Sequence, residues 1–95
     1  MTTRLLTNPV FLEHLVPAGH PERPDRLRAI EKALGDEAFA KLDRREAQSA
    51  DESAVILAHP ESHLAFVKRR IPQEGLARLD AAASVSPTSF EAAMT

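Results

Sequence analysis

Three prolines and a glycine fall within eight residues, and this stretch constrains the fold more than any other feature of the chain. Pro17, Gly19, Pro21 and Pro24 separate an irregular apolar segment from a strongly patterned one. Each proline fixes its own φ and restricts the residue before it, which disfavours both a helix interior and an inner strand. The sequence therefore predicts a stiff loop here, and its protonatable and charged side chains make it a candidate site.

The segment after the loop has the clearest helical pattern in the sequence. Its apolar residues recur with i, i+3, i+7 spacing on one face, at Leu27, Ile30 and Leu34. Pro24 suits the first turn, where its missing N–H has no partner inside a helix. Gly35 is a favourable left-handed stop. We predict a helix over residues 24–34.

The other expected elements are short. The first half of the chain should hold a strand at 4–7 closed by the turn Asn8-Pro9, a helix at 36–42 with Phe39 and Leu42 facing inward, and a strand or coil at 44–48. A capping box of Ser49 and Glu52 should open a helical stretch through Leu57 or Ala58. After it we expect a helix that follows Pro60 and is stopped by Pro72, a connector at 75–80 with room for a short strand, and a helix started by Ser86-Pro87.

Composition excludes several classes of protein. The net charge of −2 and the absence of Trp and Tyr argue against nucleic-acid binding, which uses basic faces and stacking aromatics. Without cysteine there is no disulfide scaffold, thiolate nucleophile or cysteine-containing zinc knuckle. No apolar run is long enough for a membrane span, and the N-terminus lacks the pattern of a signal peptide, so we expect a cytoplasmic protein.

Two histidines have a spacing that can suggest a metal site. His59 and His63 are four residues apart, which on a helix would place both rings on one face. Pro60 sets His59 at or before the helix start, and no third ligand follows at a recognisable spacing. We therefore interpret them as a turn residue and a surface or half-buried residue, and expect no metal there.

The proline-rich loop carries a family resemblance. Residues 19–27, Gly-His-Pro-Glu-Arg-Pro-Asp-Arg-Leu, resemble the N-terminal loop and helix start of the histone deacetylase family. The match is to bacterial members that resemble class II deacetylases and acetylpolyamine amidohydrolases and lie near the acetoin-utilisation proteins. His14 resembles the family's opening histidine, and the stretches 5–9, 58–61 and 86–93 follow the family's order and spacing.

This resemblance implies a fold and a chemistry. The fold is an open α/β type shared with arginase, a parallel sheet flanked by helices, of which these residues would form a mostly helical N-terminal portion with one or two short strands. The chemistry is a zinc-dependent amidohydrolase that removes acetyl groups from an acylated amine, acetyl-lysine or acetylpolyamine. The metal polarises the carbonyl and activates water, and a histidine acts as general acid–base.

The catalytic groups of the family have no counterpart in the chain. The paired catalytic histidines, the Asp-x-His and Asp zinc ligands and the transition-state tyrosine all lie further along family sequences. We therefore expect residues 1–95 to be a truncated N-terminal segment of a deacetylase-like domain. It should be inactive alone and bind no zinc by itself.

A few positions carry over by resemblance. His20, Pro21 and Glu22 match the loop that shapes one wall of the active-site region. Arg26 matches an arginine beside an internal channel thought to pass acetate, where a fixed guanidinium suits a carboxylate product. One position departs from the family pattern. Relatives carry an aspartate at the rim of the pocket, where it can hold the substrate backbone. The matching residue here is Ala82, whose side chain accepts no hydrogen bond.

Two interpretations remain open from the sequence. The chain is an N-terminal piece of a deacetylase-like enzyme, whose partner is the missing C-terminal part of the domain or another protein. Alternatively it is a stand-alone, non-catalytic helical module that binds a protein. The enzyme piece should leave the Leu27/Ile30/Leu34 and Leu64/Val67/Ile71 faces exposed, whereas a module should close them on each other.

Overall fold

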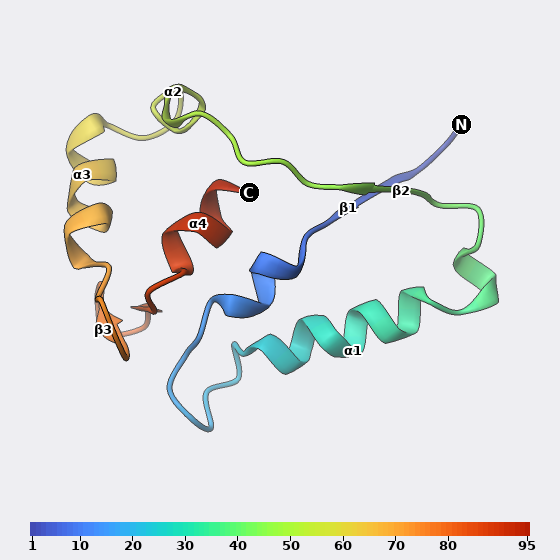
Figure 1. The fold of residues 1–95 in the computed structure, drawn as a ribbon, viewed down its shortest axis with the longest axis horizontal. Coiled ribbons are helices and arrows are strands. Elements are labelled where there is room, and N and C mark those ends of the chain that lie inside the picture. The colour runs from blue at the N-terminus through green and yellow to red at the C-terminus, as the bar shows by residue number, and fades with distance from the viewer.

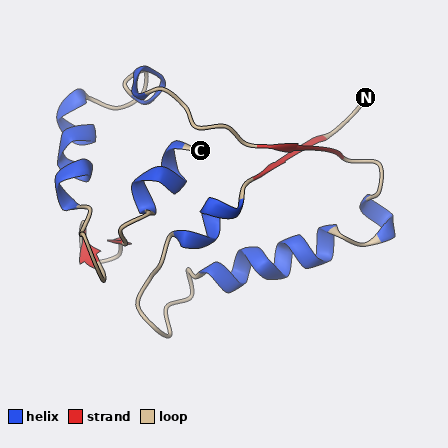
Figure 2. Ribbon diagram, in the orientation of Figure 1, coloured by secondary structure: helices blue, strands red, loops and turns tan.

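The computed structural model describes residues 1–95 as a flat, open molecule with extents of 42 × 34 × 20 Å. Figures 1 and 2 show the path of the chain. The elements in chain order are β1 (Arg4–Thr7), the 3₁₀ helix η1 (Pro9–Glu13), α1 (Pro24–Leu34), the 3₁₀ turn η2 (Glu37–Phe39), β2 (Asp43–Glu46), α2 (Glu52–Val55), α3 (Glu61–Arg70), β3 (Ala77–Arg78), β4 (Ser84–Val85) and α4 (Ser89–Met94).

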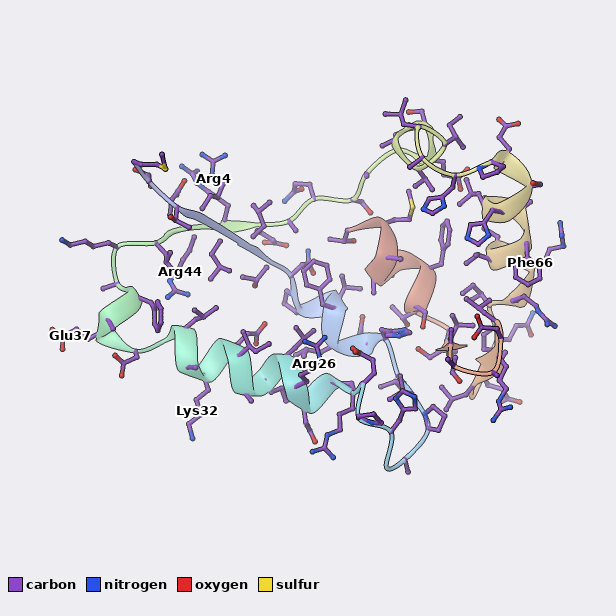
Figure 3. The ribbon with its side chains drawn as sticks, turned by 180° about the vertical axis from the view of Figure 1, so that it is seen from behind. Arg4, Arg26, Lys32, Glu37, Arg44 and Phe66 are labelled. Carbon is purple, nitrogen blue, oxygen red and sulfur yellow. The ribbon has the colours of Figure 1, made fainter.

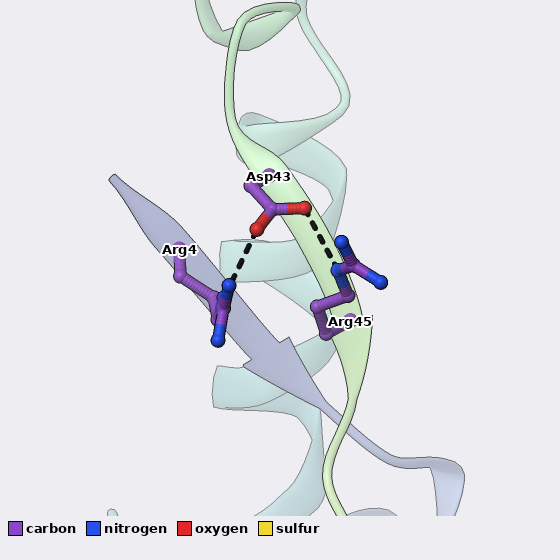
Figure 4. Close-up of polar contacts among 3 residues, drawn as sticks. All are labelled: Arg4, Asp43 and Arg45. Atoms are coloured by element: carbon purple, nitrogen blue, oxygen red, sulfur yellow. Dashed lines mark hydrogen bonds and ion pairs between the residues drawn. The ribbon is translucent and has the colours of Figure 1, made fainter. Parts of the chain in front are cut away.

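The first two strands form a parallel pair. β1 and β2 align in a register that sets Arg4 opposite Asp43 and Thr7 opposite Glu46. Asp43 joins the strands at one end, because one of its carboxylate oxygens accepts from Nε of Arg4 on β1 at 3.0 Å (Figure 4). Its other carboxylate oxygen accepts from Nε of Arg45 on its own strand at 2.9 Å. Helix α1 with the turn η2 forms the crossover between them, as a parallel pair requires.

Asn8 ends β1 and begins the next element. Its Oδ1 accepts the N–H of Val10 at 2.9 Å, and its Nδ2 donates to the carbonyl of Ala47 at 3.0 Å. A side chain that accepts from the second residue of a helix is an N-cap, and Pro9 suits the position that follows. The expected turn is thus the start of η1, and the same side chain ties η1 to the end of β2.

Helix α1 has the predicted bounds, Pro24 to Leu34. No residue of this helix is buried, and Ile30 on its apolar face is 42% exposed. The left-handed stop expected at Gly35 is wrong: this glycine is right-handed, with φ −76°, and its N–H donates to Glu31 O at 3.1 Å. The helix simply continues into a tight turn, so glycine's special conformations are not needed there.

Three other predicted elements are corrected by the structure. The helix expected over 36–42 is only the turn η2, capped by Asp36 Oδ1 accepting Ala38 N–H at 2.9 Å, and Phe39 is 40% exposed. The capping residue of α2 is Asp51 instead of Ser49, and the helix ends at Val55, before the expected end at Leu57 or Ala58. The last helix begins at Ser89, three residues after the expected cap at Ser86. The hydroxyl of Ser86 does not cap α4, because it accepts the N–H of Leu15 and donates to the carbonyl of Glu13.

Asp51 is the one carboxylate with a clearly shifted pKa. Its Oδ1 accepts the backbone N–H of Ser53 at 2.9 Å, and hydrogen bonds from Ser53 lower the pKa of Asp51 below its ordinary value of 3.8. Because the folded pKa is lowered, the cap stabilises α2 at pH values above the ordinary pKa. That stabilisation is lost as the pH falls through the folded pKa.

This cap gives a testable acid transition. The amide resonance of Ser53, followed by NMR, should titrate with a midpoint below 3.8, and α2 should fray at the acid end. Asp51→Asn is the matched control, because its amide oxygen keeps the hydrogen bond and does not titrate in this range. A midpoint at or above 3.8 would contradict the cap.

The core is small and lies where η1, β4 and α4 meet. Six of 95 residues are buried, namely Val10, Ala47, Val85, Met94, Ser86 and Ser89. Helix α4 packs on η1 and accepts the N–H of Ala50 at its Met94 carbonyl, at 2.6 Å. A helix this short is stable only when packed, and these contacts supply the packing.

The second amphipathic helix follows the sequence prediction. α3 begins after Pro60 and ends at Arg70, and Leu64, Val67 and Ile71 are half-buried. In Figure 1 α3 and α4 lie at one end of the molecule, and α1 runs along the opposite side beneath β1 and β2. No helix in the structure has both the length and the apolarity that a membrane span requires.

Candidate functional site

The proline-rich loop is ordered by a tight turn. His20 N–H donates to the carbonyl of Pro17 at 3.1 Å, and Gly19 between them has φ +81°. A positive φ at the third residue is what a type II turn requires, and glycine adopts it without steric cost. The turn brings the chain back toward α1 and places His20 after it.

His20 is held by its own loop. The N–H of Glu22 donates to His20 Nδ1 at 3.1 Å. The ring is half-buried, whereas Pro21 between them is exposed. The same Nδ1 also lies 3.3 Å from the carbonyl oxygen of Glu22. The local loop conformation thus sets the orientation of the His20 ring.

Arg26 lies in the first turn of α1, as Figure 3 shows. Its Nη2 donates to Glu22 Oε1 at 3.0 Å, and both side chains are about half exposed. Exposed ion pairs of this kind contribute less than about 1 kcal/mol. The pair therefore fixes the two side chains relative to each other more than it stabilises the fold.

A cleft of about 270 Å³ separates the loop from the β3–β4 hairpin. On the loop side it is lined by His14, His20 and Glu22, and on the hairpin side by Ala82 and Ala83. The structure therefore places His20 and Glu22, two of the three expected loop residues, across the cleft from Ala82, where the family resemblance leads us to expect an aspartate. Pro21 and Arg26 do not line the cleft. Arg26 is connected to the cleft only by its ion pair with Glu22, which does line it.

The hairpin opposite the loop is closed by Asp80. Its Oδ1 accepts the N–H groups of Ala82 and Ala83, both at 2.8 Å, and β3 pairs antiparallel with β4. Asx side chains often close turns in this way. Asp80 thus serves the turn itself, two residues before the aligned rim position.

Removing the Asp80 carboxylate should loosen this side of the cleft. We expect Asp80→Ala to lower the free energy of unfolding by about 1 kcal/mol, the worth of a turn hydrogen bond, and to speed amide exchange at Ala82 and Ala83. Urea unfolding and hydrogen exchange measure both effects. Asp80→Asn keeps an acceptor oxygen and should stay near the parent, and an unchanged Asp80→Ala would refute this role.

Two buried serines join the loop to the last helix, and sequence reasoning missed this function. Ser86 Oγ accepts the N–H of Leu15 at 2.9 Å and donates to the carbonyl of Glu13 at 3.0 Å. Ser89 Oγ accepts the N–H of Ser86 at 2.7 Å and lies 2.6 Å from His14 Nδ1. The Ser-x-x-Ser spacing is visible in the sequence, but contacts across more than 70 residues are not.

The residues of the chain do not fit a catalytic zinc. No group of three or more His, Cys, Asp or Glu side chains that could hold a metal ion exists in residues 1–95. His59 and His63 stack, with ring centroids 5.2 Å apart, but no third ligand lies beside them. Zinc sites take at least three protein ligands, so no step of a metal-dependent reaction is assigned to these residues.

Comparison with known proteins gives a structural relative. No protein-family model matches the sequence, and no curated protein matches it significantly. Among solved structures, the chain superposes on the one described as "Crystal Structure of HDA15 HD domain" with a TM-score of 0.85 and 25% sequence identity. The superposition covers 98% of this chain but only 28% of the length of that one.

This likeness supports a relation to the histone deacetylase family, which residues 19–27 indicated independently. The fold class is confirmed: a mixed α/β segment whose architecture matches part of a histone deacetylase domain. The chain spans about a quarter of the length of the domain that it resembles.

Proposed function

We propose that the chain is the N-terminal part of a zinc-dependent, histone-deacetylase-like amidohydrolase that removes acetyl groups from an acylated amine, acetyl-lysine or acetylpolyamine. The observation that carries the proposal is the cleft. Its loop wall carries His20 and Glu22, and the surrounding fold superposes on a deacetylase domain. Zinc and the groups that move protons would come from residues outside these 95, and this chain would contribute one wall of the substrate site.

The apolar surface supports this proposal over a stand-alone module. The apolar face of α1 does not close on that of α3; it borders a groove of about 400 Å³ with Leu6 and Phe11. Leu6 is 57% exposed and Ile30 is 42% exposed. A self-contained module would bury these faces, whereas the segment of a larger domain leaves them for its remaining elements.

The parallel strand pair supports the same conclusion. Parallel sheets occur with both faces covered and with more than two strands. All four residues of β2 are charged, as is typical of a protected edge, whereas β1 carries Leu5 and Leu6 at its centre. β1 is therefore the strand suited to the interior of a larger sheet.

A chimera tests the proposal. Residues 1–95 replace the segment of the HDA15 HD domain that they match, and zinc-dependent acetate release is measured on an acetyl-lysine peptide and on an acetylpolyamine. We expect the chimera to be folded and active, compared with an inactive domain that lacks the segment. Equal inactivity of both proteins would refute the proposal.

The same chimera tests the missing rim carboxylate. Ala82→Asp should lower KM for the peptide substrate, because a carboxylate at the cleft can accept from the substrate backbone N–H. Ala81→Asp, an exposed neighbour outside the cleft lining, is the matched control and should leave KM unchanged. An equal effect of both substitutions would assign the change to general charge instead.

A further inference from the structure

Three polar side chains at the base of the loop, those of His14, Ser86 and Ser89, form one connected cluster. His14 Nδ1 lies 2.6 Å from Ser89 Oγ, and Ser89 Oγ lies 3.0 Å from Ser86 Oγ. Ser86 is fully buried and Ser89 nearly so, with 0% and 5% of their surfaces exposed. Because solvent cannot satisfy buried hydroxyls, the hydrogens must be distributed within the cluster itself.

The hydrogen of Ser86 is fixed first. A hydroxyl has one hydrogen to donate and two acceptor positions, and a carbonyl oxygen can only accept. Ser86 Oγ lies 3.0 Å from the carbonyl of Glu13, so its hydrogen goes there. One acceptor position of Ser86 is filled by Leu15 N–H at 2.9 Å. The other remains for Ser89, which must therefore donate.

The hydrogen of His14 follows from this count. Ser89 gives its hydrogen to Ser86 and accepts the Ser86 N–H at 2.7 Å, which leaves one acceptor position facing His14. His14 Nδ1 must then carry a hydrogen and donate it to Ser89. In the reverse arrangement, with Ser89 donating to His14, the two buried hydroxyl oxygens would face each other at 3.0 Å with no hydrogen between them.

We infer that Ser86 and Ser89 are positioning residues that hold His14 with its hydrogen on Nδ1, so that Nε2 is the nitrogen of this ring that accepts a hydrogen bond or takes up a proton at the cleft. His14 lines the cleft together with His20. This inference does not depend on the proposed function.

The tautomer is measured directly by long-range ¹H–¹⁵N NMR of the labelled chain at a pH where the imidazoles are neutral. We expect His14 to show a protonated Nδ1 and an unprotonated Nε2. The exposed His59 and His63 serve as internal references in the same spectrum. A His14 with its hydrogen on Nε2, or with the averaged pattern of the exposed histidines, would overturn the inference.

Variants separate the tautomer from general stability. Ser89→Ala removes the acceptor and should shift His14 to the pattern of the exposed histidines, whereas Ser89→Thr keeps the hydroxyl and should retain the Nδ1–H form. His14→Asn places an amide N–H near the Nδ1 position and should keep a higher Tm than His14→Gln, which places it near Nε2. An unchanged His14 signature in Ser89→Ala, or a reversed order of Tm values, would contradict the network.

Discussion

Ser86→Ala should lower the free energy of unfolding by about 2–4 kcal/mol, the largest loss expected from removing a single atom of this chain. Its hydroxyl is fully buried and joins the loop at Glu13 and Leu15 to Ser89. The substitution leaves a backbone N–H and a carbonyl without partners, and each unpaired buried group costs about 1–3 kcal/mol. Circular dichroism during urea unfolding measures the change.

The control for this prediction is Ser62→Ala on α3. Ser62 is exposed and takes part in none of the hydrogen bonds of the core, so its removal should change the free energy of unfolding by less than about 0.5 kcal/mol. A folded chain of this size has a small net stability, so the Ser86 variant should lose a large fraction of it. Equal stability of the two variants would show that the buried serines do not hold the loop.

Leu6→Glu should have opposite consequences in two contexts. In the 95-residue chain Leu6 is 57% exposed, so a charge there should change the free energy of unfolding by less than about 0.5 kcal/mol and reduce self-association. In the HDA15 chimera we expect β1 to lie inside a larger sheet. Burying an unpaired carboxylate there should cost several kcal/mol and prevent folding.

Gln73→Glu is the matched control for this comparison. It adds the same charge at an exposed position between α3 and β3, and it should be tolerated in both contexts. Light scattering of the isolated chain and soluble yield of the chimera measure the two effects. A chimera that tolerates Leu6→Glu as well as it tolerates Gln73→Glu would contradict an interior position for β1.

Local sequence signals predicted the parts of the fold that local interactions determine. The bounds of α1 follow from Pro24 and from the spacing of Leu27 and Leu34, and α3 starts after Pro60 as expected. The helix starts at Ser49 and Ser86 were predicted wrongly. Asp51 competes for the first cap, and the hydroxyl of Ser86 is engaged by Glu13 and Leu15 instead.

In the candidate site, too, the residues that belong to a local motif were predicted and those that depend on distant contacts were not. The loop residues His20 and Glu22 were identified because a short motif carries them, and the structure places both on the cleft. The roles of Ser86 and Ser89 depend on contacts with residues more than 70 positions away, which no local pattern encodes. The pairing of β1 with β2 is likewise set by the crossover through α1 and not by either strand alone.

The coding sequence that follows codon 95 tests the central claim most directly. If these residues are the N-terminal part of a deacetylase-like domain, translation beyond Thr95 should continue the last helix and reach an adjacent histidine pair and then an Asp-x-His element. These are the residues that the family resemblance assigns to catalysis and zinc binding. A downstream sequence with neither element in any reading frame would contradict the claim and favour a partner-binding module.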